Sequence, residues 1–174
     1  MKTLLIALAT ALSASVAGAQ PTPTPADGPV WAFTAAKPPE TVSYLRYAIP
    51  DADEIGVTLS CPRKSGEITA RFDVDQRLAD HLQGRTWVDR IGRPPPWPIS
   101  VTLASATAAT TLRGQAQPDE MNGGSSISVD VSDRAPVLAE FARTGQLKLT
   151  ALSGSVQPPP APKGLAGRFL RSCR

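Results

Sequence analysis

Histidine and cysteine are scarce in this chain, with one histidine, His81, and two cysteines, Cys61 and Cys173. A metal site built from several histidines is therefore excluded, and any Ser-His-Asp mechanism has to use His81. The sequence also lacks a Gly-x-Ser-x-Gly elbow and a Gly-x4-Gly-Lys phosphate loop, which removes the common hydrolase and nucleotide-binding signatures. We expect no catalytic motif, no cofactor and no metal ion.

Strong net charge is absent as well. The 18 Lys and Arg residues exceed the 15 Asp and Glu residues by only three, an excess too small to predict a nucleic-acid partner. The acidic stretches Asp51–Glu54 and Asp119–Glu120 are short and lack the ligand pattern of a calcium loop. We interpret both as polar turns.

No apolar run is long enough to span a membrane. Leu4–Val16 covers about a dozen uncharged residues, fewer than the ~20 of a membrane-spanning helix. It follows Lys2 and precedes the small residues Ala17–Ala19, which is the pattern of a secretory signal. We predict a signal peptide over residues 1–19, with cleavage after Ala19, no membrane span afterwards, and a periplasmic or extracellular location. A retained N-terminal anchor is the alternative.

An exported protein meets an oxidising environment, and its even number of cysteines favours pairing. We predict a disulfide between Cys61 and Cys173. In the chain-entropy description a closed loop of roughly 100 residues stabilises a protein by about 4–5 kcal/mol. Two buried thiols or an intermolecular bridge are the alternatives.

Proline is the strongest compositional bias, at 18 residues. Residues 20–29 are proline-rich, have no apolar periodicity, and are typical of an extended tether. The remaining length, 30–174, suits one domain.

Alternation of apolar and polar residues predicts a sheet. Ile55–Cys61 and Ile68–Val74 alternate with period two and are separated by a turn sequence, so we expect a hairpin. A second turn is expected at 50–53. Further strands are expected at Val30–Thr34, Thr41–Ala48, Thr86–Ile91, Ile99–Leu103, Thr110–Arg113, Ile127–Val131 and from Leu147.

Helical spacing occurs in three places. Leu78 and Leu82 predict a short helix or helical turn over 75–83, an apolar stripe predicts one over 132–143, and Leu165, Phe169 and Cys173 share one face of a C-terminal helix. The expected fold is mainly β, a β-rich α+β domain. It is an antiparallel sandwich or curled sheet with two or three short helices, its C-terminal helix joined by the disulfide to an early strand.

One segment suggests binding. Residues 85–98 combine three arginines with two tryptophans, and both residue types are frequent at binding hot spots. We expect Arg85, Trp87, Arg90, Arg93 and Trp97 to contact a ligand. The alternative is that Trp87 belongs to the core and Trp97 folds back over a sheet edge.

These observations favour a non-enzymatic exported binding domain or cell-envelope accessory domain. Its partner would be an envelope protein, an extended peptide or an anionic glycan, and not nucleic acid. The alternative is a small exported hydrolase that uses His81 with a serine or a carboxylate. It requires His81 near both a carboxylate and a hydroxyl, inside a concave pocket.

Overall fold

The computed structural model describes residues 28–50 and 55–174 of the chain. The expected signal peptide, nearly all of the expected tether and the acidic turn at Asp51–Glu54 lie outside these residues. Within them, no helix is long and apolar enough to cross a membrane.

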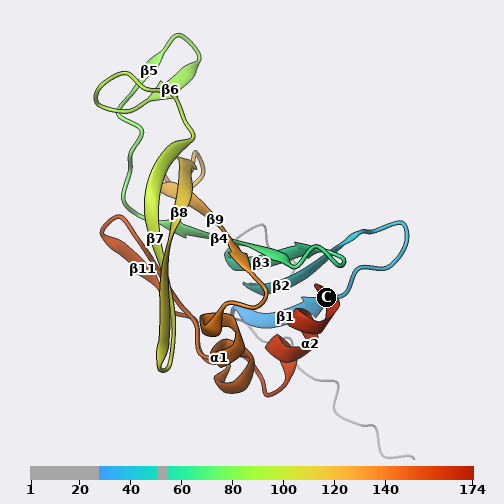
Figure 1. Cartoon of the computed structure of the whole chain (residues 1–174). Coiled ribbons are helices and arrows are strands. Elements are labelled where there is room, and N and C mark those ends of the chain that lie inside the picture. Colours follow the sequence, from blue (N-terminus) through green and yellow to red (C-terminus); the bar gives the residue numbers. More distant parts are fainter. Residues whose placement is uncertain (1–27, 51–54) are drawn as a thin grey trace, which may run out of the picture.

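Nine strands form one antiparallel sheet in the order β1-β2-β3-β4-β9-β8-β7-β10-β11, and β5 and β6 form a separate hairpin (Figure 1). Two helices, α1 (Pro136–Thr144) and α2 (Leu165–Ser172), complete the fold. The strands are β1 (Val30–Thr34), β2 (Val42–Ala48), β3 (Ile55–Pro62), β4 (Glu67–Val74), β5 (His81–Gln83), β6 (Thr86–Val88), β7 (Trp97–Ser105), β8 (Ala108–Pro118), β9 (Ser125–Ser132), β10 (Lys148–Ala151) and β11 (Gly154–Val156).

Apolar residues at every second position of the strands form the core face of the sheet. Ile68, Ala70, Phe72 and Val74 of β4 are all buried, while the residues between them face outward. β4 pairs with β3, as expected for a hairpin, and with β9, where Phe72 lies opposite Ile127. Because side chains on one face lie at every second residue, the register places apolar pairs on the same side.

The sheet is a single curled sheet, which decides between the two predicted arrangements. α1 packs against β7 and β8, α2 packs against β2, and β11 returns to touch β4. Gly154 of β11 lies so close to Val74 that a Cβ atom there would come within 2.9 Å of the Val74 Cβ atom. Gln76 Oε1 also accepts hydrogen bonds from the backbone N–H and the hydroxyl of Ser153, at 2.7 and 2.5 Å.

Helix α1 covers most of the helix expected over 132–143, but it begins only at Pro136. Pro136 occupies the first turn, where its missing N–H costs no hydrogen bond, and Val137, Leu138 and Phe141 are buried. Gly145 ends the helix at a φ of 73° and donates its N–H to the Phe141 carbonyl at 2.8 Å. Burying a large apolar side chain such as Phe141 contributes roughly 1.5–3 kcal/mol, so this stripe anchors the helix on the sheet.

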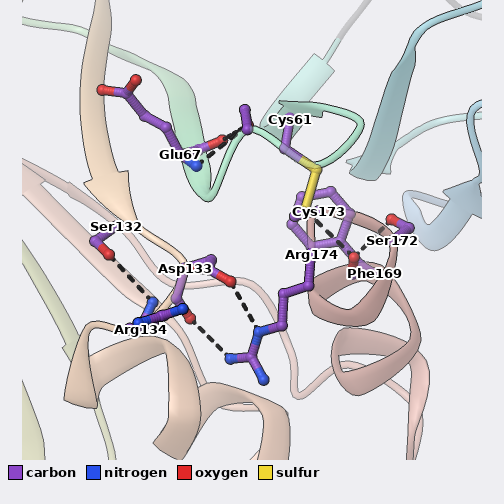
Figure 2. Close-up of polar contacts among 10 residues, drawn as sticks. Cys61, Glu67, Ser132, Asp133, Arg134, Phe169, Ser172, Cys173 and Arg174 are labelled. Atoms are coloured by element: carbon purple, nitrogen blue, oxygen red, sulfur yellow. Dashed lines mark hydrogen bonds and ion pairs between the residues drawn. A yellow bond between two sulfur atoms is a disulfide. The ribbon is translucent and has the colours of Figure 1, made fainter.

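The predicted disulfide is present. Figure 2 shows Cys61, near the end of β3, joined to Cys173 after α2. Their Cα atoms are 5.7 Å apart. Both cysteines are fully buried. The C-terminal helix is therefore joined covalently to an early strand, as expected.

The predicted helix over 75–83 is wrong. Residues 75–80 are irregular, and His81–Gln83 is strand β5, paired with β6 around a two-residue turn in which Gly84 has a φ of 66°. The Asp80 N–H donates to the Val88 carbonyl at 2.8 Å and extends the pairing. Backbone pairing with Thr86–Val88 therefore prevails over the four-residue spacing of Leu78 and Leu82.

Several predicted strands differ in extent from the structure, and β7 and β9 are each longer than expected. The strand expected over Thr86–Ile91 ends at Val88, and the one expected over Thr110–Arg113 is the middle of the longer β8. Pro98 pairs with Gln115 on β8, in the part of β7 that β10 does not reach. Among the described strands β7 has a neighbour on one side only at this point, and such an edge position tolerates the missing N–H of Pro98.

Candidate functional site

The segment 75–96, here called the arm, leaves the sheet after β4 and returns at β7. It contains the β5–β6 hairpin and stands at the top of Figure 1, beyond the ends of β7 and β8. Most of its side chains are exposed, whereas Ala79, Val88 and Asp89 are buried. The arm therefore has a small anchored base and a large free surface.

Trp87 and Arg77 form the centre of the arm. The Arg77 guanidinium lies over the Trp87 indole, 4.5 Å from the ring centroid, and the indole is half-buried against the core. A cation over an aromatic face at an exposed site contributes about 0.5–1 kcal/mol. The pair holds the irregular stretch before β5 against β6.

Asp89 organises the turn that follows β6. Its carboxylate accepts hydrogen bonds from the N–H groups of Ile91 and Arg93, at 3.0 and 2.8 Å, and from Arg93 Nε at 2.8 Å. Burial alone would raise the pKa of Asp89, but these hydrogen bonds and the Arg93 charge outweigh it and hold the pKa below its usual value. The Asp89 and Arg93 charges are therefore paired with each other inside the turn.

The loop between β8 and β9 faces the arm and has a similar internal carboxylate. Asp119 accepts hydrogen bonds from the N–H groups of Met121 and Asn122 and from Asn122 Nδ2, at 3.0 to 3.2 Å. Burial opposes ionisation of Asp119, but these hydrogen bonds prevail and lower its pKa. Beside this loop, burial and the nearby Asp119 charge raise the pKa of Asp73 on β4, although Ser126 and Arg71 act in the opposite direction.

Two hollows lie along the arm. The smaller, of about 520 Å³, is bounded by 76–80 and by the Asp89 turn, including Arg90, Ile91 and Arg93. The larger, of about 620 Å³, lies between the arm and the β8–β9 loop. Arg77 and Ala79 line both hollows, so the two concavities adjoin along one stretch of backbone. The larger hollow is lined by Arg77, Ala79, Leu82, Gly84, Arg85, Trp87, Pro118, Asp119, Glu120, Gly123 and Gly124.

Four of the five residues expected to contact a ligand lie on these hollows. Arg85 and Trp87 line the larger one, and Arg90 and Arg93 line the smaller. Trp97 is only 3% exposed and donates its indole N–H to the Arg93 carbonyl at 3.0 Å. Trp97 is the first residue of β7 and belongs to the buried core, so it neither lines a hollow nor folds back over a sheet edge.

The sequence interpretation missed Arg77 and the β8–β9 loop as parts of the site. Arg77 lay inside the expected helix, where nothing indicated that it would reach Trp87 ten residues later. Only the hairpin brings the two side chains together. The loop is more distant still in the chain, and it meets the arm because β9 begins opposite the end of β4, where the arm starts.

His81 lies on the exposed side of β5. Its Nδ1 atom is 3.0 Å from Asp80 Oδ2, and both side chains are 55% exposed. His81 lines neither hollow, and no hydroxyl hydrogen-bonds to it within the described part of the chain. The predicted hydrolase arrangement thus has a carboxylate beside the histidine but neither the hydroxyl nor the concave setting. Among residues 28–50 and 55–174, no cluster of three or more His, Cys, Asp or Glu side chains could hold a metal ion.

Comparison of this chain with protein-family models, with curated proteins and with solved structures finds no match in any of the three.

Proposed function

We propose that this protein is a non-enzymatic exported binding domain whose arm binds an anionic partner, in the periplasm or outside the cell. The observation that carries this proposal is that, among the side chains lining the two hollows, more arginines than carboxylates lack a partner within the described residues. The N-terminal pattern over 1–19 and the oxidised cysteine pair support export.

Most carboxylates that line the hollows already contact other groups of this protein. Asp89 and Asp119 accept hydrogen bonds from their own turns, and Asp80 contacts His81. Glu120 alone has no such partner in the described part of the chain. Carboxylates held by backbone N–H groups and arginine are poor acceptors for an additional ligand.

Most arginines that line the hollows form no ion pair within the described residues. Arg77, Arg85 and Arg90 form no ion pair with any described residue, whereas Arg93 is paired with Asp89. Among the residues that line the hollows, three guanidinium groups without an ion pair therefore outnumber the single carboxylate without a partner. Guanidinium groups present several N–H donors in a planar fork that suits carboxylates, so the site favours an anionic partner.

The test is a titration of the isotope-labelled protein with polyglutamate and with polygalacturonate at low salt, followed by amide NMR shifts. We expect shifts concentrated in the arm and in the β8–β9 loop. The combined variant Arg77→Gln/Arg85→Gln/Arg90→Gln should weaken binding about tenfold or more.

The matched control is Arg63→Gln/Arg168→Gln/Arg171→Gln, which removes the same charge from exposed arginines outside the arm. It should leave binding nearly unchanged. Equal losses in the two triple variants, or shifts spread evenly over the whole surface, would show nonspecific attraction and overturn the proposal. Export is tested separately by mass spectrometry of the N-terminus after expression in a bacterial host.

A further inference from the structure

We infer that the partner of the arm is an extended, acidic segment of another protein that also carries aliphatic side chains, rather than an anionic glycan. This inference rests on the proposed function and adds the chemical class of the ligand. It is carried by the exposed apolar side chains at and beside the two hollows, an observation independent of the arginines.

Large exposed apolar residues gather at this end of the molecule. Within the described residues only four are well exposed, and three of them, Leu82, Ile91 and Met121, belong to the arm or to the β8–β9 loop. They are 53%, 73% and 82% exposed. Leu82 lines the larger hollow, Ile91 lines the smaller, and Met121 belongs to the loop that forms the opposite wall. A concentration of exposed aliphatic side chains around concavities is typical of protein-binding surfaces.

The aromatic surface at the same place is poorly suited to a sugar. Saccharide rings pack on open aromatic faces, and Trp87 is the only aromatic residue that lines either hollow. One face of its indole is already covered by the Arg77 guanidinium. The apolar contacts that remain exposed are aliphatic, and these match the side chains of a peptide.

The shape of the site also suits an extended chain. The two hollows adjoin at Arg77 and Ala79, on either side of one short stretch of the arm. An extended segment rises about 3.3 Å per residue and turns alternate side chains to opposite sides. Such a segment can place aliphatic side chains against Leu82 and Ile91 while its carboxylates reach Arg85 and Arg90.

The experiment compares three probes at one salt concentration by isothermal titration calorimetry. They are a peptide of alternating glutamate and leucine, a polyglutamate peptide of the same length, and polygalacturonate. We expect the mixed peptide to bind about tenfold tighter than either other probe, because it alone buries apolar area.

The triple variant Leu82→Ser/Ile91→Ser/Met121→Ser should abolish this advantage and leave polyglutamate binding unchanged. All three side chains are exposed, so the variant should keep the thermal stability of the wild type, which circular dichroism checks. Val30→Ser, at the fourth exposed apolar residue and away from the arm, is the matched control. It should preserve the advantage.

Three outcomes would overturn the inference and leave the proposed function standing. These are equal or tighter binding of polygalacturonate, an advantage of the mixed peptide that survives the triple serine variant, and a dimer in sedimentation that the same variant converts to a monomer. If none of the probes shifts the amides of the arm, the proposed function fails as well.

Discussion

Arg174, the last residue of the chain, binds the buried Asp133 that follows β9. Its Nε atom donates to Asp133 Oδ2 at 2.8 Å, and its terminal nitrogen donates to the Asp133 carbonyl at 3.2 Å (Figure 2). The Gly66 N–H donates to the Cys173 carbonyl, and the Asp133 N–H donates to the Gly66 carbonyl. The end of the chain, the β3–β4 turn and the start of α1 are thus joined next to the disulfide.

Arg174→Ala should destabilise the fold, because it leaves the Asp133 carboxylate buried without its cation. Since the Arg174 side chain is half exposed, we expect a loss of about 1–2 kcal/mol, smaller than for a fully buried pair. Urea unfolding measures the loss. Arg171→Ala, at an exposed position of α2, should stay within about 0.5 kcal/mol of the wild type. Equal effects of the two variants would refute a specific role for Asp133.

The disulfide should contribute more than this ion pair. Cys61→Ala/Cys173→Ala is expected to lower the free energy of unfolding by about 2–5 kcal/mol, since the unfolded chain regains the freedom of a long loop. The wild type should show no reactive thiol when it is denatured without reductant. Two reactive thiols per chain would contradict the observed bridge.

The Arg77–Trp87 contact should be visible by fluorescence. Arg77→Gln removes the guanidinium from the indole face, so acrylamide should quench Trp87 more strongly, and stability should fall by about 0.5–1 kcal/mol. The Trp87→Phe variant identifies the part of the emission that belongs to this residue. Arg85→Gln, which removes the same charge elsewhere in the arm, should leave quenching unaltered. Identical quenching in Arg77→Gln and the wild type would mean that the two side chains do not stack in solution.

Asp73 should make stability depend on pH in an unusual direction. Its pKa is raised in the folded protein, chiefly by burial, so folding favours the protonated carboxyl. The protein therefore loses stability as the pH rises from the usual carboxyl value of 3.8 through the raised folded value. Asp73→Asn removes this loss and keeps an acceptor for Ser126.

We accordingly expect the melting temperature of Asp73→Asn, relative to wild type, to be higher at pH 7 than at pH 3. Thermal unfolding by circular dichroism at both pH values measures the difference. A relative melting temperature that falls between pH 3 and pH 7 would show that hydrogen bonding, and not burial, dominates at Asp73.

The sequence predicted those parts of the fold whose cause is local. Strands β3 and β4 bury every second residue, as does β9 from Ile127 onward, so their apolar period is visible in the sequence without any partner strand. Pro136 and Gly145 mark the ends of α1 by their own backbone preferences. The pairing of Cys61 with Cys173 followed from the number of cysteines and the helical face that carries the second one.

Tertiary structure alone decided the rest. In the arm the local signal was misleading, because Leu78 and Leu82 have helical spacing but the backbone gains its hydrogen bonds from β6. The choice between a sandwich and a curled sheet depended on close approach between distant strands, as at Gly154 and Val74. The larger hollow exists because the β8–β9 loop meets the arm. Contacts between residues far apart in the chain leave no periodic mark in the sequence, so only the folded molecule shows them.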